Sequence, residues 1–187
     1  MKQVQLGAMR VDKIWEMDGA MPMRMVLPGV AAADLARLRT WWWAEEMADD
    51  PEVAQFKLSV HSWVLRVDGL KILVDACNGN HKTRSMPFAD NLETDWLTRL
   101  GKLGLKPEDI DLVMCTHLHA DHVGWNTRLV DGRWVPTFPN ARYVFSRKEY
   151  EHWKQDDAEP MHHEAFVDSV LPVLESGQAD LVENDHV

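Results

Sequence analysis

Apolar positions along the chain follow two spacings: an alternation typical of strands, and three- or four-residue steps typical of helices. Segments 58–67 and 71–75 are strand-like and flank Asp68-Gly69, a pair typical of a two-residue hairpin turn. A mostly apolar run from Ile110 to Cys115 predicts a buried strand. Shorter strands are expected at 4–6, 11–15 and 142–145.

Helical spacing or composition predicts four helices. They are expected at 30–47, 90–103, 146–154 and 164–174. Gly104 follows the second helix and is expected to end it. Ser146 is expected to cap the third helix, with Glu149 at its third helical position as in a capping box. The fourth helix is expected to bend or restart at Pro172, and segment 22–28 to form a loop.

The strongest chemical signal follows the apolar run at 110–115. Three imidazoles and one carboxylate lie close together there, in the order His117, His119, Asp121 and His122. Imidazole nitrogen and carboxylate oxygen are ligands that suit zinc, iron and manganese. A surface loop that happens to be rich in histidine is the alternative, but the spacing favours a metal site at the end of a buried strand.

The spacing also indicates how two ions would be shared. His117 and His119 are two residues apart, so in an extended backbone they point to the same side and can hold one ion. Asp121 and His122 follow after the chain has begun to turn, and they can hold a second ion. Asp121 is the candidate catalytic residue, since it would hold the second metal and orient a water molecule. We therefore expect a dinuclear site, with the ions about 3.5–4 Å apart.

Segment 116–124, Thr-His-Leu-His-Ala-Asp-His-Val-Gly, resembles the signature of the metallo-β-lactamase superfamily. Its continuation through Trp125-Asn126-Thr127 is most similar to bacterial members related to the acyl-homoserine lactone lactonases. Upstream, segment 73–79 resembles the family's second strand and its Asp-containing turn. The resemblance implies an α/β fold, the αββα sandwich of this family.

The resemblance covers only part of that fold. The family's later ligands are a histidine in a Gly-His turn, a bridging aspartate and a distal histidine, and no Gly-His pair occurs here. His162, His163 and His186 match none of the later ligand motifs. We therefore expect residues 1–187 to form a single metallo-β-lactamase-like domain that corresponds to the first half of the sandwich plus a little more, truncated at its C-terminus.

The resemblance implies a metal-dependent hydrolase in which a metal-bound hydroxide attacks a lactone or another ester-like small molecule. Its cofactors would be two divalent ions, with zinc as the first choice and iron or manganese as alternatives. Two other functions stay open. One is iron-dependent oxidation of a thiol substrate at the same site, and the other is a non-catalytic truncated product.

The composition of the chain limits the kinds of molecule that it is expected to bind. The formal net charge of −10 argues against a nucleic-acid or anionic-membrane surface. No apolar run is long enough for a membrane span and no signal peptide is visible, so a cytoplasmic protein is expected. Cys77 and Cys115 imply no disulfide framework, and Cys115 is expected to be a small core residue. A missing half would expose strand residues such as Val113 and Val144, so a homo-oligomer or a complementary fragment is expected to cover them.

Three further features have two interpretations each. Trp41-Trp42-Trp43 could border a substrate pocket or pack in a core. Asp75 could orient a ligand histidine or simply form a turn before Asn78-Gly79. His81 and Lys82 could face the pocket mouth or lie on a solvated loop.

Overall fold

The computed structural model describes residues 3–38, 48, 50–155 and 160–183. The three tryptophans at 41–43 and His186 lie outside these residues, so the expectations placed on them stay predictions. The chain divides into two compact units, one made of residues 17–59 and the other of residues 1–16 with 60–187.

The smaller unit has a core of its own. It contains helices α1 (Met23–Val26) and α2 (Ala32–Leu38). Met23, Leu35 and Ala54 are buried together there. Segment 22–28 was expected to be a loop, and that expectation was wrong in part. The amide of Leu27 donates to the carbonyl of Met23 and closes a helical turn in this segment.

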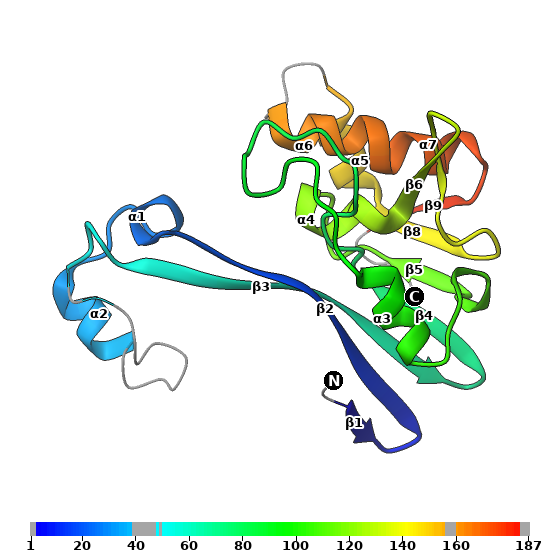
Figure 1. The fold of residues 1–187 in the computed structure, drawn as a ribbon, viewed down its shortest axis with the longest axis horizontal. Coiled ribbons are helices and arrows are strands. Elements are labelled where there is room, and N and C mark those ends of the chain that lie inside the picture. Colours follow the sequence, from blue (N-terminus) through cyan, green and yellow to red (C-terminus); the bar gives the residue numbers. More distant parts are fainter. Residues whose placement is uncertain (1–2, 39–47, 49, 156–159, 184–187) are drawn as a thin grey trace. The chain divides into compact units, whose positions relative to one another are not determined.

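Within the described residues, seven strands form the main sheet in the order β1-β2-β3-β4-β5-β8-β9 (Figure 1). They are β1 (Gln3–Leu6), β2 (Met9–Pro22), β3 (Gln55–Val67), β4 (Leu70–Val74), β5 (Leu112–Met114), β8 (Arg142–Ser146) and β9 (Ala179–Val182). The strand pairs β1–β2 and β3–β4 are antiparallel, whereas β4, β5, β8 and β9 run parallel. A separate antiparallel pair, β6 (Thr127–Val130) with β7 (Arg133–Pro136), was not predicted.

The predicted hairpin is present between β3 and β4. Val67 pairs with Leu70, which leaves Asp68 and Gly69 as the two turn residues. Both have positive φ, 51° and 82°, as the turn that matches strand twist requires. Because β4 and the next two strands of the sheet are parallel, their carboxyl ends meet at one edge. The segments that follow Val74, Met114 and Ser146 therefore leave the sheet side by side.

Helices and short helical turns connect the strands of the larger unit. They are α3 (Trp96–Lys102), η2 (Pro107–Asp109), α4 (Ala120–Val123), η3 (Gly124–Asn126), α5 (Arg147–Trp153), α6 (Pro160–Ala165), η4 (Phe166–Val170) and α7 (Leu171–Glu175). Figure 1 shows α6 and α7 as one helical stretch, coloured orange to red. The turn between them, η4, is a π-helix, so the irregularity expected at Pro172 lies just before that residue.

The helix predicted at 90–103 begins only at Trp96. Its expected first turn is held in another conformation, because the Asp90 carboxylate accepts the Arg84 amide and Asn91 has a positive φ of 47°. Gly104 follows the helix with a φ of 73°, as expected of a residue that ends one.

One face of the sheet is well buried. Val64, Leu73, Val113 and Tyr143 belong to the main core, together with buried residues of α3, η4 and α7. The expectation that Val113 would be exposed was wrong, because its side chain points to this face. Val144, on the other face, is partly exposed.

The opposite face of the sheet is more open to solvent. Trp63 pairs with Val74, and Val74 pairs with Met114, so the three side chains form one row across β3, β4 and β5. Trp63 is 36% exposed and Met114 39% exposed. This row is an apolar surface.

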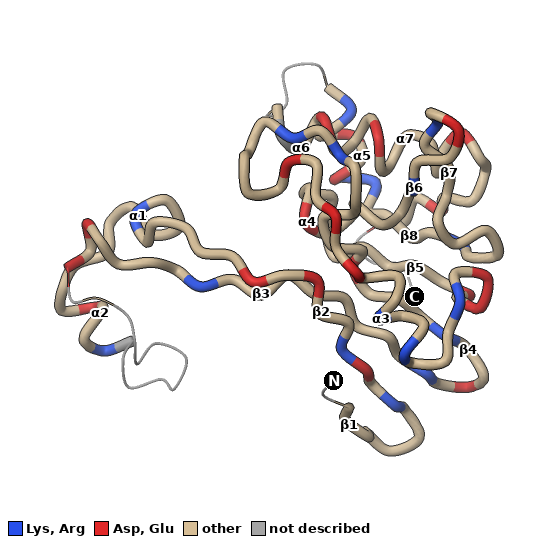
Figure 2. The backbone as a smooth tube through the Cα atoms, in the orientation of Figure 1, with Lys and Arg blue, Asp and Glu red and all other residues tan. Residues whose placement is uncertain are grey.

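Acidic and basic residues are interspersed along the backbone of the larger unit (Figure 2). A search of the described residues for a helix long and apolar enough to cross a membrane found none.

Candidate metal centre

The four predicted ligands lie on the loop that follows β5 and on the short helix α4. The ring centroids of His117 and His122 are 3.9 Å apart, and those of His117 and His119 are 4.5 Å apart. Asp121 belongs to the same group, with its Oδ2 atom 3.3 Å from Nε2 of His122. The fold therefore brings three imidazoles and a carboxylate together at the carboxyl edge of the parallel strands.

Side chains from three other elements hold the backbone of this loop. Every second amide, at residues 116, 118 and 120, donates to one of them. The acceptors are Asp75 Oδ1 at 2.8 Å, Glu149 Oε2 at 3.0 Å and His162 Nδ1 at 3.1 Å. Since the side chains of His117 and His119 leave the backbone between these amides, the acceptors fix the part of the loop that carries them.

Asp75 also contacts the ligand side chains. Its Oδ2 atom lies 2.9 Å from Nδ1 of His122, and both of its oxygens accept the Thr116 hydroxyl. Because that hydroxyl donates to Asp75, its oxygen can accept a hydrogen bond from Nδ1 of His117, 3.1 Å away. Burial alone would raise the pKa of Asp75, but the hydrogen bonds from His122 and Thr116 bring it below the usual value. These contacts favour the interpretation that Asp75 orients ligands.

The electrostatics at His122 suit a positive charge. Burial opposes protonation of its ring, but hydrogen bonds to Asp121 and Asp75 outweigh burial and raise its pKa to about 9. Burial lowers the pKa of His117, with further lowering by the charges of His122 and His119. Burial would raise the pKa of Asp121, yet its hydrogen bond with His122 holds it below normal. Two carboxylates therefore contact the ring of His122 and create a place that suits a cation.

Among the described residues, no set of three or more His, Cys, Asp or Glu side chains is arranged ready to hold a metal ion. The polar atoms of the group are instead paired with one another, as the contacts of His122 with Asp75 and Asp121 show. The donor types and the proximity of the rings fit a metal centre, in which an ion would replace the shared protons. The assignment of the four residues as ligands stays a prediction.

The turn after His122 packs directly against the turn after β4. The Gly124 amide donates to the Cys77 carbonyl at 2.7 Å, and the Ala76 amide donates to the His122 carbonyl at 2.7 Å. A Cβ atom on Gly124 would lie 1.7 Å from the carbonyl oxygen of Asn78. Only glycine permits this approach, which explains its place two residues after His122.

Glu16, near the middle of β2, joins the same two turns by hydrogen bonds. Its buried carboxylate accepts the Asn78 and Gly79 amides at 2.9 Å and 3.2 Å, and the Trp125 indole N–H at 2.7 Å. Burial raises its pKa despite these hydrogen bonds. Sequence reasoning missed this residue, because nothing local distinguishes it from any other strand glutamate.

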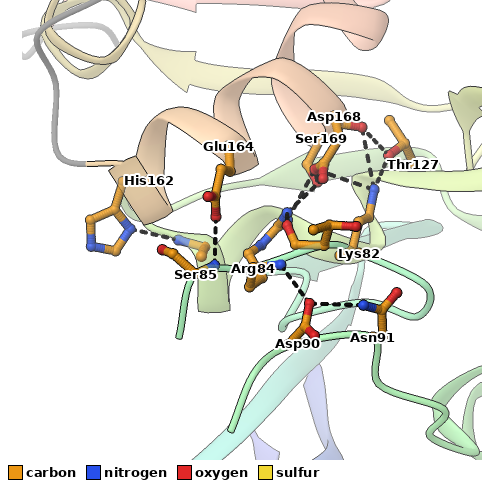
Figure 3. A network of polar contacts seen from close by, with 12 residues as sticks. Lys82, Arg84, Ser85, Asp90, Asn91, Thr127, His162, Glu164, Asp168 and Ser169 are labelled. Carbon is orange, nitrogen blue, oxygen red and sulfur yellow. Dashed lines mark hydrogen bonds and ion pairs between the residues drawn. The ribbon is translucent and has the colours of Figure 1, made fainter. Parts of the chain in front are cut away.

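His162 was not expected to take part, and the structure places it against the ligand loop. Its ring stacks on that of His119, with centroids 3.9 Å apart and planes 14° apart. The Trp153 ring meets the His119 ring edge-on at 5.3 Å. Figure 3 shows His162 reaching out from α6 toward the amide that it accepts. His163, in contrast, contacts the carbonyl of Trp153.

Two smaller expectations need correction. Ser146 precedes α5 but makes no capping hydrogen bond, and Glu149 accepts the Leu118 amide and the Trp153 indole N–H instead of closing a capping box.

Lys82 neither faces a pocket mouth nor lies in solvent, because its side chain is fully buried. His81, its neighbour, is exposed and lies 3.8 Å from Glu93. Cys77 and Cys115 are both buried free thiols, and for Cys115 this confirms the expected place in the core.

Residues 56–186 match the metallo-beta-lactamase superfamily, so the chain belongs to that superfamily. The mixed α/β architecture with one large sheet agrees with its fold. The predicted family and fold class are thereby confirmed.

Comparison with individual proteins gives partial matches. The chain is 30% identical over 102 residues to a probable metallo-hydrolase, MJ0296, of Methanocaldococcus jannaschii, covering 52% of this chain and 44% of that protein. A probable metal-dependent hydrolase from Staphylococcus aureus superimposes with a TM-score of 0.73 at 18% identity, over 96% of this chain and 61% of that one. The dizinc quorum-quenching lactonase AidC superimposes with a TM-score of 0.70 at 18% identity, over 100% and 62%. The chain thus spans about half to three fifths of these relatives.

Proposed function

We propose that this chain forms the metal-binding part of a hydrolase that acts on a lactone or another ester-like small molecule. The observation that carries the proposal is the grouping of His117, His119, Asp121 and His122, with Asp75 linked to His122 directly and to His117 through the Thr116 hydroxyl. We also propose that both units belong to one domain of this family. The family match begins at residue 56, inside the smaller unit, and runs through the larger one to residue 186.

The ligands divide into two pairs. His117 and His119 would hold one divalent ion, and Asp121 with His122 the other. Nδ1 of His122 faces Asp75 and Nδ1 of His117 faces the Thr116 hydroxyl, which leaves the two Nε2 atoms for metal. Zinc is our first choice for nitrogen and carboxylate ligands, with iron and manganese as alternatives. Ions of this kind make a water acidic near neutral pH and polarise a carbonyl group.

The chain's own residues prepare the site for that chemistry. Asp75 orients two of the rings, and its carboxylate compensates part of the positive charge that an ion would bring. The side chain of Asp121 is partly exposed, so it could accept a proton or orient a water molecule. Glu149 and His162 hold the loop backbone in place, so an entering ion would require side chains rather than the backbone to rearrange.

The lactone proposal is supported by similarity alone. AidC is described as a lactonase in complex with an acyl-homoserine product, and a lactonase of Azorhizobium caulinodans, AttM, is 38% identical over 50 residues, 27% of this chain and 16% of that protein. An acyl-homoserine lactone is therefore the first substrate to test.

The test uses the purified 187-residue chain. Bound zinc, manganese and iron(II) are measured by elemental analysis and competition titration, and hydrolysis of hexanoyl-homoserine lactone is followed with each metal. The double variant His117→Ala/His119→Ala should lose bound metal and any hydrolysis together. His81→Ala, which removes one exposed histidine elsewhere, is the matched control and should change neither.

Three outcomes would replace the proposal. Undiminished metal content in the double variant would rule out the ligand assignment. Oxygen uptake with a thiol substrate in the iron-loaded chain, without lactone hydrolysis, would establish oxidation instead. A chain that binds metal through the assigned residues but turns over no ester would be a non-catalytic product.

A further inference from the structure

A buried ionic cluster lies beneath the helical stretch that carries His162. Arg84 makes a bidentate ion pair with Asp168, at 2.6 Å and 3.0 Å. Lys82 lies 3.5 Å from the same carboxylate and donates to the Thr127 hydroxyl at 2.6 Å. All three charged residues are at least nine-tenths buried. Figure 3 shows them converging from the loop after β4 and from the helix.

Burying such a cluster has a desolvation cost that its own attraction often fails to offset. A buried ion pair is therefore weak evidence of a stabilising role, and the question is what geometry it fixes. Asp168 belongs to η4, the π turn, and π turns are rare and frequent at functional sites. Four residues earlier on the same stretch, Glu164 accepts the Ser85 amide at 2.9 Å. The loop at 82–85 thus holds the helix at two successive places.

The N-terminal part of this helical stretch, before Glu164, contacts the ligand loop. His162 lies two residues before Glu164, accepts the Ala120 amide and stacks on His119. Ala120 is the first residue of α4, and the next two residues are the ligands Asp121 and His122. Any rotation or sliding of the helix would move His162 and, through it, both His119 and the start of α4.

We propose that the Arg84–Asp168 ion pair positions the metal ligand His119 by fixing the helix that presents His162. Arg84 and Asp168 are positioning residues here, because they contact each other, backbone groups and neighbouring side chains rather than the ligands. The proposal rests on the metal centre proposed above. Part of its test needs no metal, so the two can fail separately.

The first readout is amide hydrogen exchange in the metal-free chain. In Asp168→Asn, exchange at Ala120 should become at least about tenfold faster, because its acceptor His162 has moved. Exchange at Leu118, whose acceptor is Glu149, should stay within about twofold. The control is Val173→Ala, which removes buried side-chain volume from the same helical stretch beyond the anchor. It should speed neither amide selectively.

The second readout is the affinity of the chain for zinc. The visible spectrum of the cobalt(II)-substituted chain is recorded beside it. Asp168→Asn should weaken zinc binding about 10–100-fold, as loss of an outer partner does, and alter the cobalt spectrum. Val173→Ala should lower the melting temperature about as much as Asp168→Asn does, but it should leave the zinc affinity and the cobalt spectrum unchanged. In the His162→Phe background, which keeps a ring to stack but removes the acceptor, Asp168→Asn should add little, because both changes act through one contact.

Arg84→Lys covers the case in which Asp168→Asn does not fold. It keeps the charge and loses the bidentate geometry, and it should give the same selective exchange at Ala120 in milder form. Unchanged Ala120 exchange in every folded anchor variant would overturn the proposal. So would fully additive losses of zinc affinity with His162→Phe. If the wild-type chain binds no zinc, the metal centre fails, and the exchange measurement still decides whether the ion pair positions His162.

Discussion

Asp75 and His122 are joined at 2.9 Å between a carboxylate oxygen and ring nitrogen Nδ1, across the carboxyl ends of two adjacent parallel strands. The same carboxylate accepts the Thr116 hydroxyl, which in turn lies 3.1 Å from the ring of His117. One side chain therefore sets the orientation of two candidate ligands on opposite ends of the motif. Asp75 directly follows β4 and lies more than forty residues before these histidines in the sequence.

The first prediction follows from this contact. Asp75→Ala should weaken zinc binding about 10–100-fold, because both rings lose the group that orients them. The measurement is competition with a coloured zinc chelator. Asp111→Ala is the matched control, because Asp111 also accepts a backbone amide, that of Lys71, but precedes β5 rather than following it. Equal zinc affinity in the Asp75 variant and the control would remove Asp75 from the site.

The second prediction concerns Gly124. Gly124→Ala should destabilise the chain by roughly 3 kcal/mol or more, because the new Cβ would overlap the backbone of Asn78 and both turns would have to separate. Gly101→Ala is the control, since Gly101 lies inside α3 with nothing within 4 Å of an added Cβ. It should stabilise the chain by about 0.5–1 kcal/mol. Urea denaturation of the two variants measures both effects, and similar midpoints would contradict the close approach.

The third prediction uses the buried Lys82. Burial lowers its pKa to about 7, and the attraction of Asp168 offsets only part of this effect. The unfolded chain then binds more protons than the folded one between about pH 7 and the ordinary lysine value near 10.5, so Lys82 favours folding more as the pH rises through this range. The contribution of Lys82 to the free energy of unfolding reaches its full value above about pH 10.5 and is lost as the pH falls toward 7.

The comparison variant for this effect is Lys82→Met. The stability of the wild type relative to this variant should increase between pH 7 and pH 10, with a slope of at most about 1.4 kcal/mol per pH unit. Taking the difference removes other groups common to both chains, including Cys115, whose pKa burial raises to about 12. A difference that is flat or falls with rising pH would show that the lysine keeps its charge in the fold.

Features of the fold that depend on a few neighbouring residues could be predicted from the sequence. The hairpin at Asp68-Gly69, the strand before the histidines and the proximity of His117, His119, Asp121 and His122 could all be predicted, because each depends on neighbours in sequence. The β6–β7 hairpin was missed although its turn, Asp131-Gly132, carries the same dipeptide signal and also has positive φ values, 50° and 75°. Its strands are four residues long, too short for alternation to stand out.

The parts that sequence reasoning missed depend on distant partners. Glu16 acts on Asn78, 62 residues away, and on Trp125, 109 residues away. Lys82 was expected in solvent or at a pocket, as loop lysines usually are, and it is buried because Thr127 and Asp168 supply its contacts. His162 matched no ligand motif, since its role depends on stacking and on one backbone amide rather than on spacing. Residue type was enough to propose a chemistry for these side chains, but only the fold shows what positions them.

The last prediction concerns the open face of the main sheet. Trp63, Val74 and Met114 form a continuous apolar row there, and the two outer members are more than a third exposed. A row of this kind favours association, so the purified 187-residue chain should self-associate in a concentration-dependent way. Met114→Lys places a charge in the middle of the sheet and should weaken this association at least about tenfold, as measured by sedimentation velocity. The control is Leu129→Lys, because Leu129 is 44% exposed but lies in the separate β6–β7 pair. If the wild type sediments as a monomer at every concentration, or if the two lysine variants behave alike, this face is not the surface through which the chain associates.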